Sequence, residues 1–426
     1  MRNRKLVGSS AFLVLMTLIF GACAQEEAGQ DRGGTTGKPE YKIALMGDLT
    51  GSTALLIVGQ NKAARVAIKE VNDDEDFPVR IKLQSEDTQG DADKAVPLAQ
   101  KLAADDKVLA IVGPGFSGES FSANPIIQQA GIPQVTPSAT NPGLSQQGWK
   151  SWWRALGNDN SQGGPAPDVA LKYLGAKKVF VAHDNTPYGK GLAEIVRNRL
   201  NETDSKVLAG FEGIEPDKED YGALATKLAN SKADVFFYGG YSPEAGKIIK
   251  QARDRGYQGK LLAGDGAKDG TFTKGSGEQE ENSYFLCPCA DLTASDDPMA
   301  KEFADKYKDQ IGEEVTVYSS EGYDATRIIL EAIRKAGRPG SDIKAYRAKV
   351  AGNIRSVKDF KGTSKVYNWQ PNGELVDESV VINLFRHRNG KFEFIGPAEE
   401  VVKEAASPGA TGSPAATASP GGTASP

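Results

Sequence analysis

Short apolar runs alternate with amphipathic segments along most of this chain, and this alternation limits the possible folds more than any other feature. Buried strands are predicted at 43–46, 108–112, 179–182, 235–238 and 261–263. Between such runs, apolar residues recur at helical spacing, as in 192–200 and 325–336. Strands that alternate with helices form parallel sheets with helices on both faces. Because the pattern occurs both before and after about residue 158, we predict an α/β fold of two Rossmann-like lobes.

The last part of the folded chain has a different pattern. Strand-like segments at 366–369, 380–386 and 392–395 are separated by Pro371-Asn372-Gly373 and Arg388-Asn389-Gly390. Asn-Gly pairs between strand-like segments favour tight turns. A short antiparallel meander is therefore predicted at the end of the folded chain.

Segments at both ends of the chain have compositions that cannot build an apolar core. Residues 24–39 are polar, with Gly-Gly and Thr-Thr pairs, and we predict a flexible tether over 23–39. From Ala405 onward the chain contains only Ala, Ser, Pro, Gly and Thr, so a disordered tail is predicted at 404–426. The folded domain is then 40–403. Its lobes are expected to be joined by a multi-strand hinge and to comprise 41–158 with 290–365, and 159–289 with 366–398.

The first 23 residues have the pattern of a secretory signal. A basic start is followed by an apolar run over 6–20, which is shorter than the roughly 20 residues that a bilayer span needs. The string 19–23 resembles a bacterial lipobox, although Phe20 stands where leucine is usual. We predict a signal peptide over 1–22 and a lipid on Cys23, which would anchor an extracytoplasmic protein to the cell membrane. The alternative is plain secretion with an unmodified Cys23.

The net charge argues against nucleic-acid binding, and the small number of cysteines and histidines argues against a metal site. A formal net charge of −5 does not supply the basic face that nucleic-acid binding requires. Cys287 and Cys289 lack the second ligand pair of a zinc site, and the chain has only two histidines, His183 and His387. We therefore expect no nucleic acid, no metal and no cofactor. The two cysteines either close a small-loop disulfide or stay as free thiols, in a structural or incidental role.

A glycine-rich stretch, 113–120, follows the predicted strand 108–112, and a helical pattern begins at about Ser117. Ligands of open parallel sheets bind beyond the carboxyl ends of the strands. A helix N-terminus at that place suits a carboxylate or a phosphate. The stretch is neither G-x-G-x-x-G nor G-x-S-x-G, since Glu119 replaces the last glycine of the second motif. A tight turn explains the glycines equally well.

Three further stretches combine small or polar residues with the end of a predicted strand. The loop 136–142 offers hydroxyl groups, and 238–244 offers two glycines with Tyr241. In 262–266, Asp265 lies between glycines, where it forms a turn or pairs with a ligand ammonium in a closed cleft. Each stretch alone fits a surface loop as well as a ligand site.

Taken in order, these stretches resemble the branched-chain amino-acid (Leu/Ile/Val) binding proteins of bacterial ABC transporters, which have the type I periplasmic-binding fold. The resemblance covers the whole predicted folded domain. It is carried by the runs 43–51, 87–88, 111–114, 138–142, 183–185, 188–191, 238–244 and 321–325.

The resemblance implies how the head group of an amino acid is held. The hydroxyls of Ser117 and Thr140, with nearby backbone amides, would receive the ligand carboxylate. The carbonyl of Ser138, together with Thr140 and Asp265, would receive the ammonium. Glutamate is the residue of close relatives where Asp265 stands.

The resemblance also implies the surroundings of the ligand side chain. Ala139 would pack against the ligand, Tyr188 and Tyr241 would close over it from the second lobe, and Tyr318 would line the side-chain pocket. Two departures fall near that pocket: 55–59 lacks the aromatic ring of Leu/Ile/Val binders, and Phe116 replaces a cysteine. The resemblance thus implies an amino-acid ligand, with a preference for Leu, Ile or Val.

The resemblance implies a monomeric solute-binding protein that delivers its ligand to an ABC permease in the membrane. Alternatives are a protein of the same fold that binds an amide, urea or an aromatic compound, and a ligand sensor that signals without transport. A hydrolase built from Ser117 and His183 lacks a nucleophile elbow, so no enzymatic activity is expected. His183 is expected to be structural and His387 to be solvated.

Overall fold

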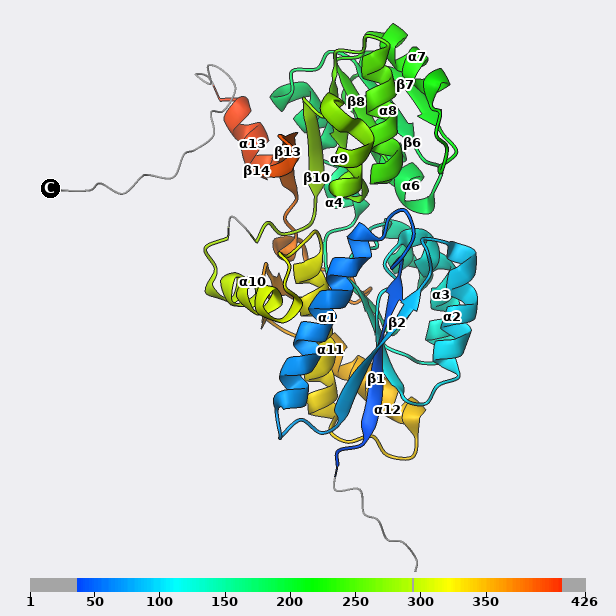
Figure 1. Ribbon diagram of the computed structural model, residues 1–426, viewed down its shortest axis with the longest axis vertical. Helices are drawn as coiled ribbons and strands as arrows, with labels where there is room; N and C mark the ends of the chain where they lie inside the picture. The colour runs from blue at the N-terminus through cyan, green and yellow to red at the C-terminus, as the bar shows by residue number, and fades with distance from the viewer. Residues whose placement is uncertain (1–36, 293–294, 408–426) are drawn as a thin grey trace, which may run out of the picture. The chain divides into compact units, whose positions relative to one another are not determined.

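A computed structural model describes residues 37–292 and 295–407, and in it the apolar runs form two separate sheets (Figure 1). The first sheet is parallel and has the order β2-β1-β3-β4-β5. Its strands are β1 (Glu40–Gly47), β2 (Arg80–Asp87), β3 (Val108–Val112), β4 (Gln134–Thr136) and β5 (Trp152–Arg154). The helices of this lobe are α1 (Leu55–Asp73), α2 (Ala92–Ala103), α3 (Ser117–Gln129), α10 (Pro298–Ile311), α11 (Ser319–Ala336) and α12 (Ile343–Arg355).

The second sheet has the order β14-β13-β10-β9-β8-β6-β7, with β13 antiparallel to both β10 and β14. Its strands are β6 (Val179–His183), β7 (Leu208–Gly213), β8 (Val235–Gly239), β9 (Lys260–Ala263), β10 (Ser283–Cys287), β13 (Asn383–Arg388) and β14 (Lys391–Pro397). The helices are α4 (Asp159–Gly163), α5 (Ala166–Asp168), α6 (Pro187–Asp204), α7 (Gly222–Ser231), α8 (Ser242–Asp254), α9 (Gly270–Ser276) and α13 (Ala398–Ala405). The second lobe also has the shorter helical turns η2 (Val169–Tyr173), η3 (Ser205–Val207), η4 (Asp265–Ala267) and η5 (Gly277–Gln279), whereas η1 (Pro142–Gln147) belongs to the first lobe and η6 (Asp377–Ser379) lies between the lobes.

Each central strand supplies side chains to two cores, because successive residues of a strand point to opposite faces of the sheet. On β1, Ile43 and Leu45 pack in the core that contains α1 and α11, whereas Ala44 and Met46 pack in the core with α2 and α3. Figure 1 shows these two helix pairs on opposite sides of the first sheet. This arrangement confirms the predicted fold class of helices on both faces of parallel sheets.

Two long helices of the first lobe approach each other closely. Gly322 of α11 lies against α1, and a methyl group on Gly322 would lie 2.7 Å from the Cα of Gln60. Only a glycine therefore fits at this crossing. The contact fixes the start of α11, which carries Tyr318 as its N-cap residue.

Three segments connect the lobes. They run over 155–158, between β5 and α4, over 288–292, which leads from β10 toward α10, and over 377–382, before β13. The chain was predicted to return to the second lobe at 366, which is too early. The strand β12 (Val366–Tyr367) still pairs with β11 (Phe360–Lys361), and the N–H of Arg154, in the first sheet, donates to the Gly373 carbonyl at 2.9 Å. The segment 366–369 thus does not join the meander, which consists of β10, β13 and β14.

The prediction that His387 is solvated is wrong, because the structure buries its side chain. Strand alternation turns it inward from β13 while Arg388 faces solvent. Its Nε2 lies 2.8 Å from the Thr273 hydroxyl, and its Nδ1 lies 3.3 Å from a Glu280 carboxylate oxygen. Its role is therefore in the core of the second lobe.

The ends of the chain are only partly covered. The signal segment, Cys23 and most of the tether lie outside the described residues, as does the tail from 408 on. Helix α13 continues to Ala405, past the predicted end of the folded domain. None of the described helices is long and apolar enough to cross a membrane.

Candidate ligand-binding site

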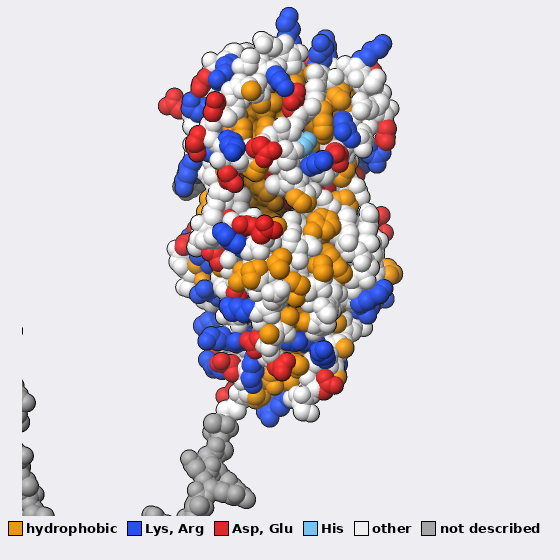
Figure 2. Space-filling model, turned by 90° about the vertical axis from the view of Figure 1, so that its right-hand side faces the viewer, with side chains coloured by type: hydrophobic (Ala, Val, Ile, Leu, Met, Phe, Trp, Pro, Cys, Tyr) orange, Lys and Arg blue, Asp and Glu red, His pale blue; other side chains and the backbone are white. Residues whose placement is uncertain are grey.

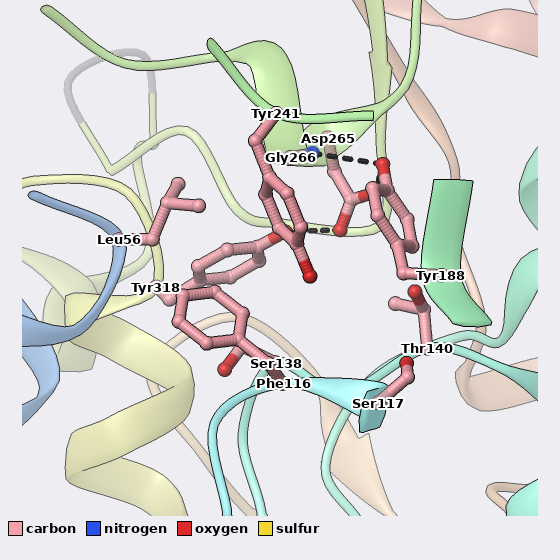
Figure 3. Close-up of a pocket in the computed structure, with 10 residues that line it drawn as sticks. All are labelled: Leu56, Phe116, Ser117, Ser138, Thr140, Tyr188, Tyr241, Asp265, Gly266 and Tyr318. Atoms are coloured by element: carbon pink, nitrogen blue, oxygen red, sulfur yellow. Dashed lines mark hydrogen bonds between the residues drawn. The ribbon is translucent and has the colours of Figure 1, made fainter. Parts of the chain in front are cut away.

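A small pocket lies between the lobes, and seven of the eight predicted ligand-site residues line it (Figure 3). The space in it that a water-sized sphere can occupy is only about 10 Å³, so the two lobes nearly touch here. On the face shown in Figure 2, apolar side chains gather in the recess between the lobes. The lining residues are Leu56, Phe116, Ser117, Ser138, Thr140 and Tyr318 from the first lobe, and Tyr188, Tyr241, Asp265 and Gly266 from the second.

One end of the pocket is the N-terminus of α3. Strand β3 leads into this helix through Gly113, which has φ +115°, and Gly115, where a methyl group would lie 2.4 Å from Ile57 Cδ1. Ser117 is the first residue of the helix, and its Oγ accepts a hydrogen bond from the Asn141 N–H at 3.1 Å. Its hydroxyl proton is thus free to be donated to a ligand. With the partial positive charge of the helix end, this place suits a carboxylate.

The loop after β4 is held in shape by Arg154, a residue of β5 that the sequence interpretation missed. Arg154 Nη1 donates to the Ala139 carbonyl at 2.5 Å, and Nη2 donates to the Asn141 carbonyl at 2.9 Å. The guanidinium also forms a buried ion pair with Glu374 at 2.8 Å. Such a planar fork of donors fixes several acceptors at once. Arg154 therefore determines which loop side chains face the pocket.

The three predicted residues of this loop have different surroundings. The Ser138 hydroxyl donates to the Gly115 carbonyl at 2.7 Å and accepts from Gln60 Nε2 at 2.9 Å, so it ties two loops together. Thr140 Oγ1 is buried and, among the described residues, has no hydrogen-bond partner of normal geometry. Ala139 does not line the pocket but packs with Leu144 and Trp152. The Thr140 hydroxyl acts on the Asp159 carboxylate, and its place in the pocket wall also makes it a candidate ligand contact.

The opposite end of the pocket is acidic. Asp265, which is 2% exposed, accepts hydrogen bonds at Oδ1 from Gln162 Nε2 and the Tyr188 hydroxyl, both at 2.7 Å. Tyr188 in turn accepts from the Gly266 N–H at 2.9 Å, which fixes the direction of its proton. Oδ2 accepts from the Tyr318 hydroxyl. Because Tyr318 belongs to the first lobe and Asp265 to the second, this bond crosses the cleft.

A second carboxylate, Asp159, lies close to Asp265 and was not predicted. It is fully buried, and neither of its oxygens has a hydrogen-bond partner of normal geometry among the described residues. Burial, and then the charge of Asp265, raise the pKa of Asp159 well above its usual range, with the Thr140 hydroxyl acting in the opposite direction. Burial also raises the pKa of Asp265, against hydrogen bonds from Tyr318 and Tyr188.

This acidic end suits a cation. Buried carboxylates are stable in the charged form only when an opposite charge or hydrogen-bond donors compensate them. The lining residues include no lysine or arginine, and Arg154 already pairs with Glu374. The charge of Lys268 interacts with that of Asp265, but Lys268 Nζ lies 3.9 Å from the centroid of the Phe385 ring and the residue does not line the pocket. A cationic group of a ligand would therefore add compensating charge on the pocket side of the carboxylates.

The wall between the two ends is apolar and aromatic. The rings of Phe116 and Tyr241 meet edge to face across the cleft with centroids 5.2 Å apart, and Tyr188 lies 5.2 Å from Tyr241. Leu56 of α1 completes this wall (Figure 3). The positions of Leu56 and Phe116 are those where the sequence departs from Leu/Ile/Val binders. Together, the three parts fit a zwitterion with an apolar side chain.

The histidine of the hydrolase alternative lies apart from these residues. His183 does not line the pocket, and its Nδ1 accepts a hydrogen bond from the Asn185 N–H at 3.1 Å. Its ring packs on Phe211 with centroids 5.1 Å apart, and burial lowers its pKa. These contacts are those of a structural histidine.

Comparisons with known proteins agree with this geometry. The family model of the periplasmic binding proteins matches residues 40–382. The Leu/Ile/Val-binding protein homolog 1 of Brucella melitensis is 31% identical over 76% of this chain and 88% of its own length. The leucine-, isoleucine-, valine-, threonine- and alanine-binding protein of Pseudomonas aeruginosa is 30% identical over 77% and 89%.

Solved structures are similar over both lobes. The branched-chain amino acid transporter substrate binding protein LivJ from Streptococcus pneumoniae, in complex with isoleucine, is 25% identical with a TM-score of 0.74, over 84% of this chain and all of that protein. The leucine binding protein LivK from Thermotoga maritima is 29% identical with a TM-score of 0.73, over 84% of this chain and 98% of that protein. These likenesses confirm the predicted two-lobe fold.

Proposed function

The chain belongs to the periplasmic binding protein family, together with the Leu/Ile/Val-binding proteins, and on that premise we propose that it captures an amino acid between its lobes and delivers it to an ABC permease. The preferred ligand is a branched-chain amino acid: Leu, Ile or Val. The observation that carries the proposal is the division of the head-group site, with Ser117 and Thr140 on the first lobe and Asp265 on the second.

This division makes closing of the cleft depend on the ligand. A ligand carboxylate at the N-terminus of α3 binds to the first lobe, and its ammonium binds to Asp265 of the second. A ligand that contacts both lobes binds the closed form better than the open form and therefore shifts the equilibrium toward it. A permease can then distinguish the loaded protein by surfaces of both lobes.

The side chain of the ligand would lie against Leu56, Phe116 and Tyr318. An apolar wall favours an aliphatic side chain, but one methylene changes binding in such a pocket by only about 1–3 kcal/mol. We therefore expect Leu, Ile and Val to differ by less than they differ from amino acids with polar side chains.

In this proposal the protein is a monomer outside the cytoplasm that has no enzymatic activity. A lipid on Cys23 holds it at the cell membrane, where it meets the permease. Mass spectrometry of the N-terminal peptide tests the anchor, since a diacylglyceryl group on Cys23 adds a defined mass.

Calorimetric titration tests the ligand. The purified protein is unfolded and refolded to remove carried-over ligand and then titrated with the twenty amino acids and several amides. We expect a Kd of about 1 μM or lower, near −8 kcal/mol, for Leu, Ile or Val. Binding of another amino acid would leave the head-group assignment intact and change the side-chain assignment. Binding of amides alone would contradict the roles of Thr140 and Asp265.

A ligand sensor with the same fold would give the same titration. Uptake of the radiolabelled ligand separates the two functions. Deleting the gene abolishes high-affinity uptake if the protein serves a transporter, and leaves uptake unchanged if it is only a sensor.

A further inference from the structure

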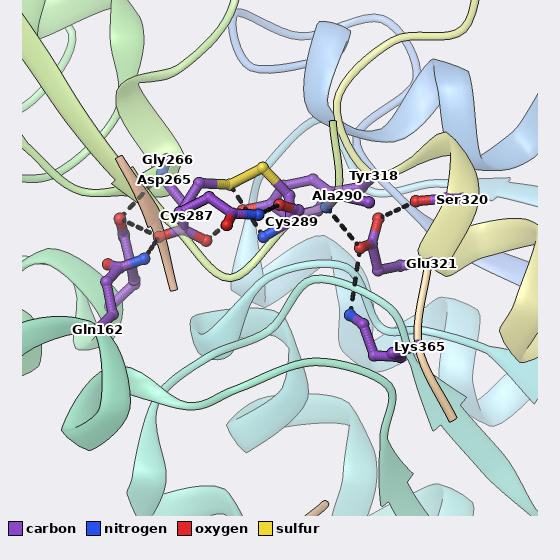
Figure 4. The surroundings of a disulfide bond; sticks show 12 residues. Gln162, Asp265, Gly266, Cys287, Cys289, Ala290, Tyr318, Ser320, Glu321 and Lys365 are labelled. Atoms are coloured by element: carbon purple, nitrogen blue, oxygen red, sulfur yellow. Dashed lines mark hydrogen bonds and ion pairs between the residues drawn. A yellow bond between two sulfur atoms is a disulfide. The ribbon is translucent and has the colours of Figure 1, made fainter. Parts of the chain in front are cut away.

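Cys287 and Cys289 form a disulfide that encloses only Pro288 (Figure 4). The bridge lies where β10 ends and the second connecting segment begins. Both cysteines are buried, at 0% and 1% exposure. The proposed ligand contacts do not include it, so its place in the molecule requires a separate explanation.

The two ends of this small ring are attached to different lobes. Cys287 pairs with Asn383 in the antiparallel ladder of β10 and β13, and Asn383 Nδ2 donates to the Cys289 carbonyl at 2.9 Å. On the other side, the Ala290 N–H donates to Glu321 Oε1 of α11 at 3.1 Å. The ring is therefore held to a strand of the second lobe by backbone pairing and, through the hydrogen bond of Ala290, to a helix of the first lobe.

The first connecting segment lies against the ring, and the third lies against the first. A methyl group on Gly157, in the first segment, would lie 2.6 Å from Val380 Cγ1 of the third segment and 3.5 Å from Pro288 Cβ. All three connections thus meet around Gly157. Any rotation of one lobe against the other must move backbone at this place.

The ring also lies directly behind the acidic end of the pocket. Figure 4 shows the disulfide between Asp265 and Gly266 on one side and Tyr318 and Ala290 on the other. The hydrogen bond from Tyr318 to Asp265 joins the lobes here. The position of the ring and the closing of the cleft are therefore mechanically connected.

We propose that the Cys287–Cys289 bridge is a redox modification site in the hinge: its reduction weakens ligand capture, and bound ligand shields it from reductants. The part that concerns affinity rests on the proposed amino-acid binding, whereas the part that concerns hinge mobility does not.

The physical basis is the freedom of the backbone in the open form. With the bridge intact, the backbone from Cys287 to Cys289 has few possible arrangements, so a rotation of the lobes is accommodated mainly by the residues on either side of the ring. Without the disulfide, the backbone of about one more residue is free in the open form. Closing the cleft must then restrict that residue, which costs conformational entropy. The expected loss of affinity is about 5- to 30-fold, the range that corresponds to fixing one residue.

Shielding by the ligand follows from the burial of both sulfurs. A thiolate of a dithiol reductant attacks one sulfur, the S–S bond breaks, and the displaced cysteine thiolate takes up a proton. The second thiolate of the reductant then resolves the mixed disulfide. In total, two electrons and two protons pass from the dithiol to the cysteine pair, and the dithiol becomes a disulfide. The attack needs access, so it proceeds from the open form, which the ligand depopulates.

The first test measures the rate of reduction. The purified protein is incubated with dithiothreitol, with or without saturating L-leucine, samples taken over time are quenched with an excess of alkylating agent, and double alkylation at Cys287 and Cys289 is followed by peptide mass spectrometry. We expect leucine to slow the reaction at least about tenfold, since reduction requires the open form. Equal rates in protein that binds leucine by calorimetry would overturn the shielding.

The second test measures the affinity for leucine after the disulfide has been removed in two different ways. Wild-type protein with dithiothreitol and the Cys287→Ser/Cys289→Ser variant should both bind leucine about 5- to 30-fold more weakly than the oxidised protein. The reductant must have no effect on the variant, which serves as the control for side effects of dithiothreitol. Unchanged affinity by both routes contradicts the proposal.

The third test needs no ligand and separates this inference from the proposed function. Reduction should increase backbone hydrogen exchange in the connecting segments 155–158 and 377–382 and leave β3 unchanged. If leucine fails to bind but the exchange increases, the proposed ligand is wrong and the hinge role stands. If the exchange does not change, the hinge role is wrong.

Discussion

Replacing Asp265 by asparagine removes one charge from the ligand site and keeps the size of the side chain. We expect the Asp265→Asn protein to fold and to bind L-leucine much more weakly than wild type does. The reason is that Asp265 is the carboxylate that lines the pocket, is 2% exposed and is oriented by Gln162, Tyr188 and Tyr318. A ligand ammonium in the closed cleft then loses its main partner.

The magnitude depends on the second carboxylate. Removing one partner of a buried, hydrogen-bonded charge pair costs about 2–5 kcal/mol. Burial and the Asp265 charge both raise the pKa of Asp159. When residue 265 is neutral, Asp159 ionises more readily and compensates part of the ammonium charge. We therefore expect a loss near the lower end, about 2–3 kcal/mol or about 30- to 150-fold in Kd.

Calorimetric titration measures this loss, and thermal unfolding checks that the variant is folded. Asp254→Asn is the matched control, because Asp254 is an exposed aspartate of α8 in the same lobe. The Asp159→Asn/Asp265→Asn double variant should lose more affinity than the single variant. A folded Asp265→Asn protein that binds leucine within about threefold of wild type would refute the reasoning.

Three further changes test the site and its supports. Arg154→Met leaves the buried Glu374 carboxylate unpaired, and we expect the free energy of unfolding in urea to fall by about 3–5 kcal/mol; a change below 1 kcal/mol would contradict this. Thr140→Val should weaken leucine binding by about 1–2 kcal/mol without lowering the melting temperature, as titration and calorimetric melting would detect. Asp159 has a raised pKa in the folded protein, so its contribution to stability is full below its unfolded pKa of about 3.9 and is lost as the pH rises through the raised value. The Asp159→Asn variant should therefore lose less stability than wild type as the pH rises above about 4. If the melting temperatures of variant and wild type fell equally with pH, that would argue against this assignment.

The predicted strands of the two parallel sheets are continuous apolar runs, although the equally buried β10 was missed. β3 has the predicted bounds, Val108–Val112, because a continuous apolar run inside a parallel sheet is a strong signal. β2 was missed, since its Arg80–Asp87 run alternates charged and apolar residues at the edge of the first sheet. The segment from 366 was assigned to the wrong lobe because its partner strand, β11, has only two residues.

The predicted ligand residues lie together because most of them follow the carboxyl ends of parallel strands, a place that topology fixes. Asp159, Arg154 and Glu374 were not predicted, since their importance arises from contacts that the order of residues does not reveal. Arg154 and Glu374 are 220 positions apart and meet only in the folded chain. His387 is a similar case, because its burial depends on Thr273 and Glu280 in another part of the second lobe.

The acidic end of the pocket connects ligand charge to closing of the cleft. Asp159 and Asp265 both belong to the second lobe, and Thr140 and Tyr318 of the first lobe cover them when the lobes meet. Closing an empty cleft therefore removes two carboxylates from water, which is unfavourable unless one of them takes up a proton. In the proposed function, a ligand ammonium compensates these charges at the moment of closing. The hydrogen bond from Tyr318 to Asp265 then adds to a closed state that the ligand has made favourable, so the same carboxylates that recognise the amino group also oppose closing without it.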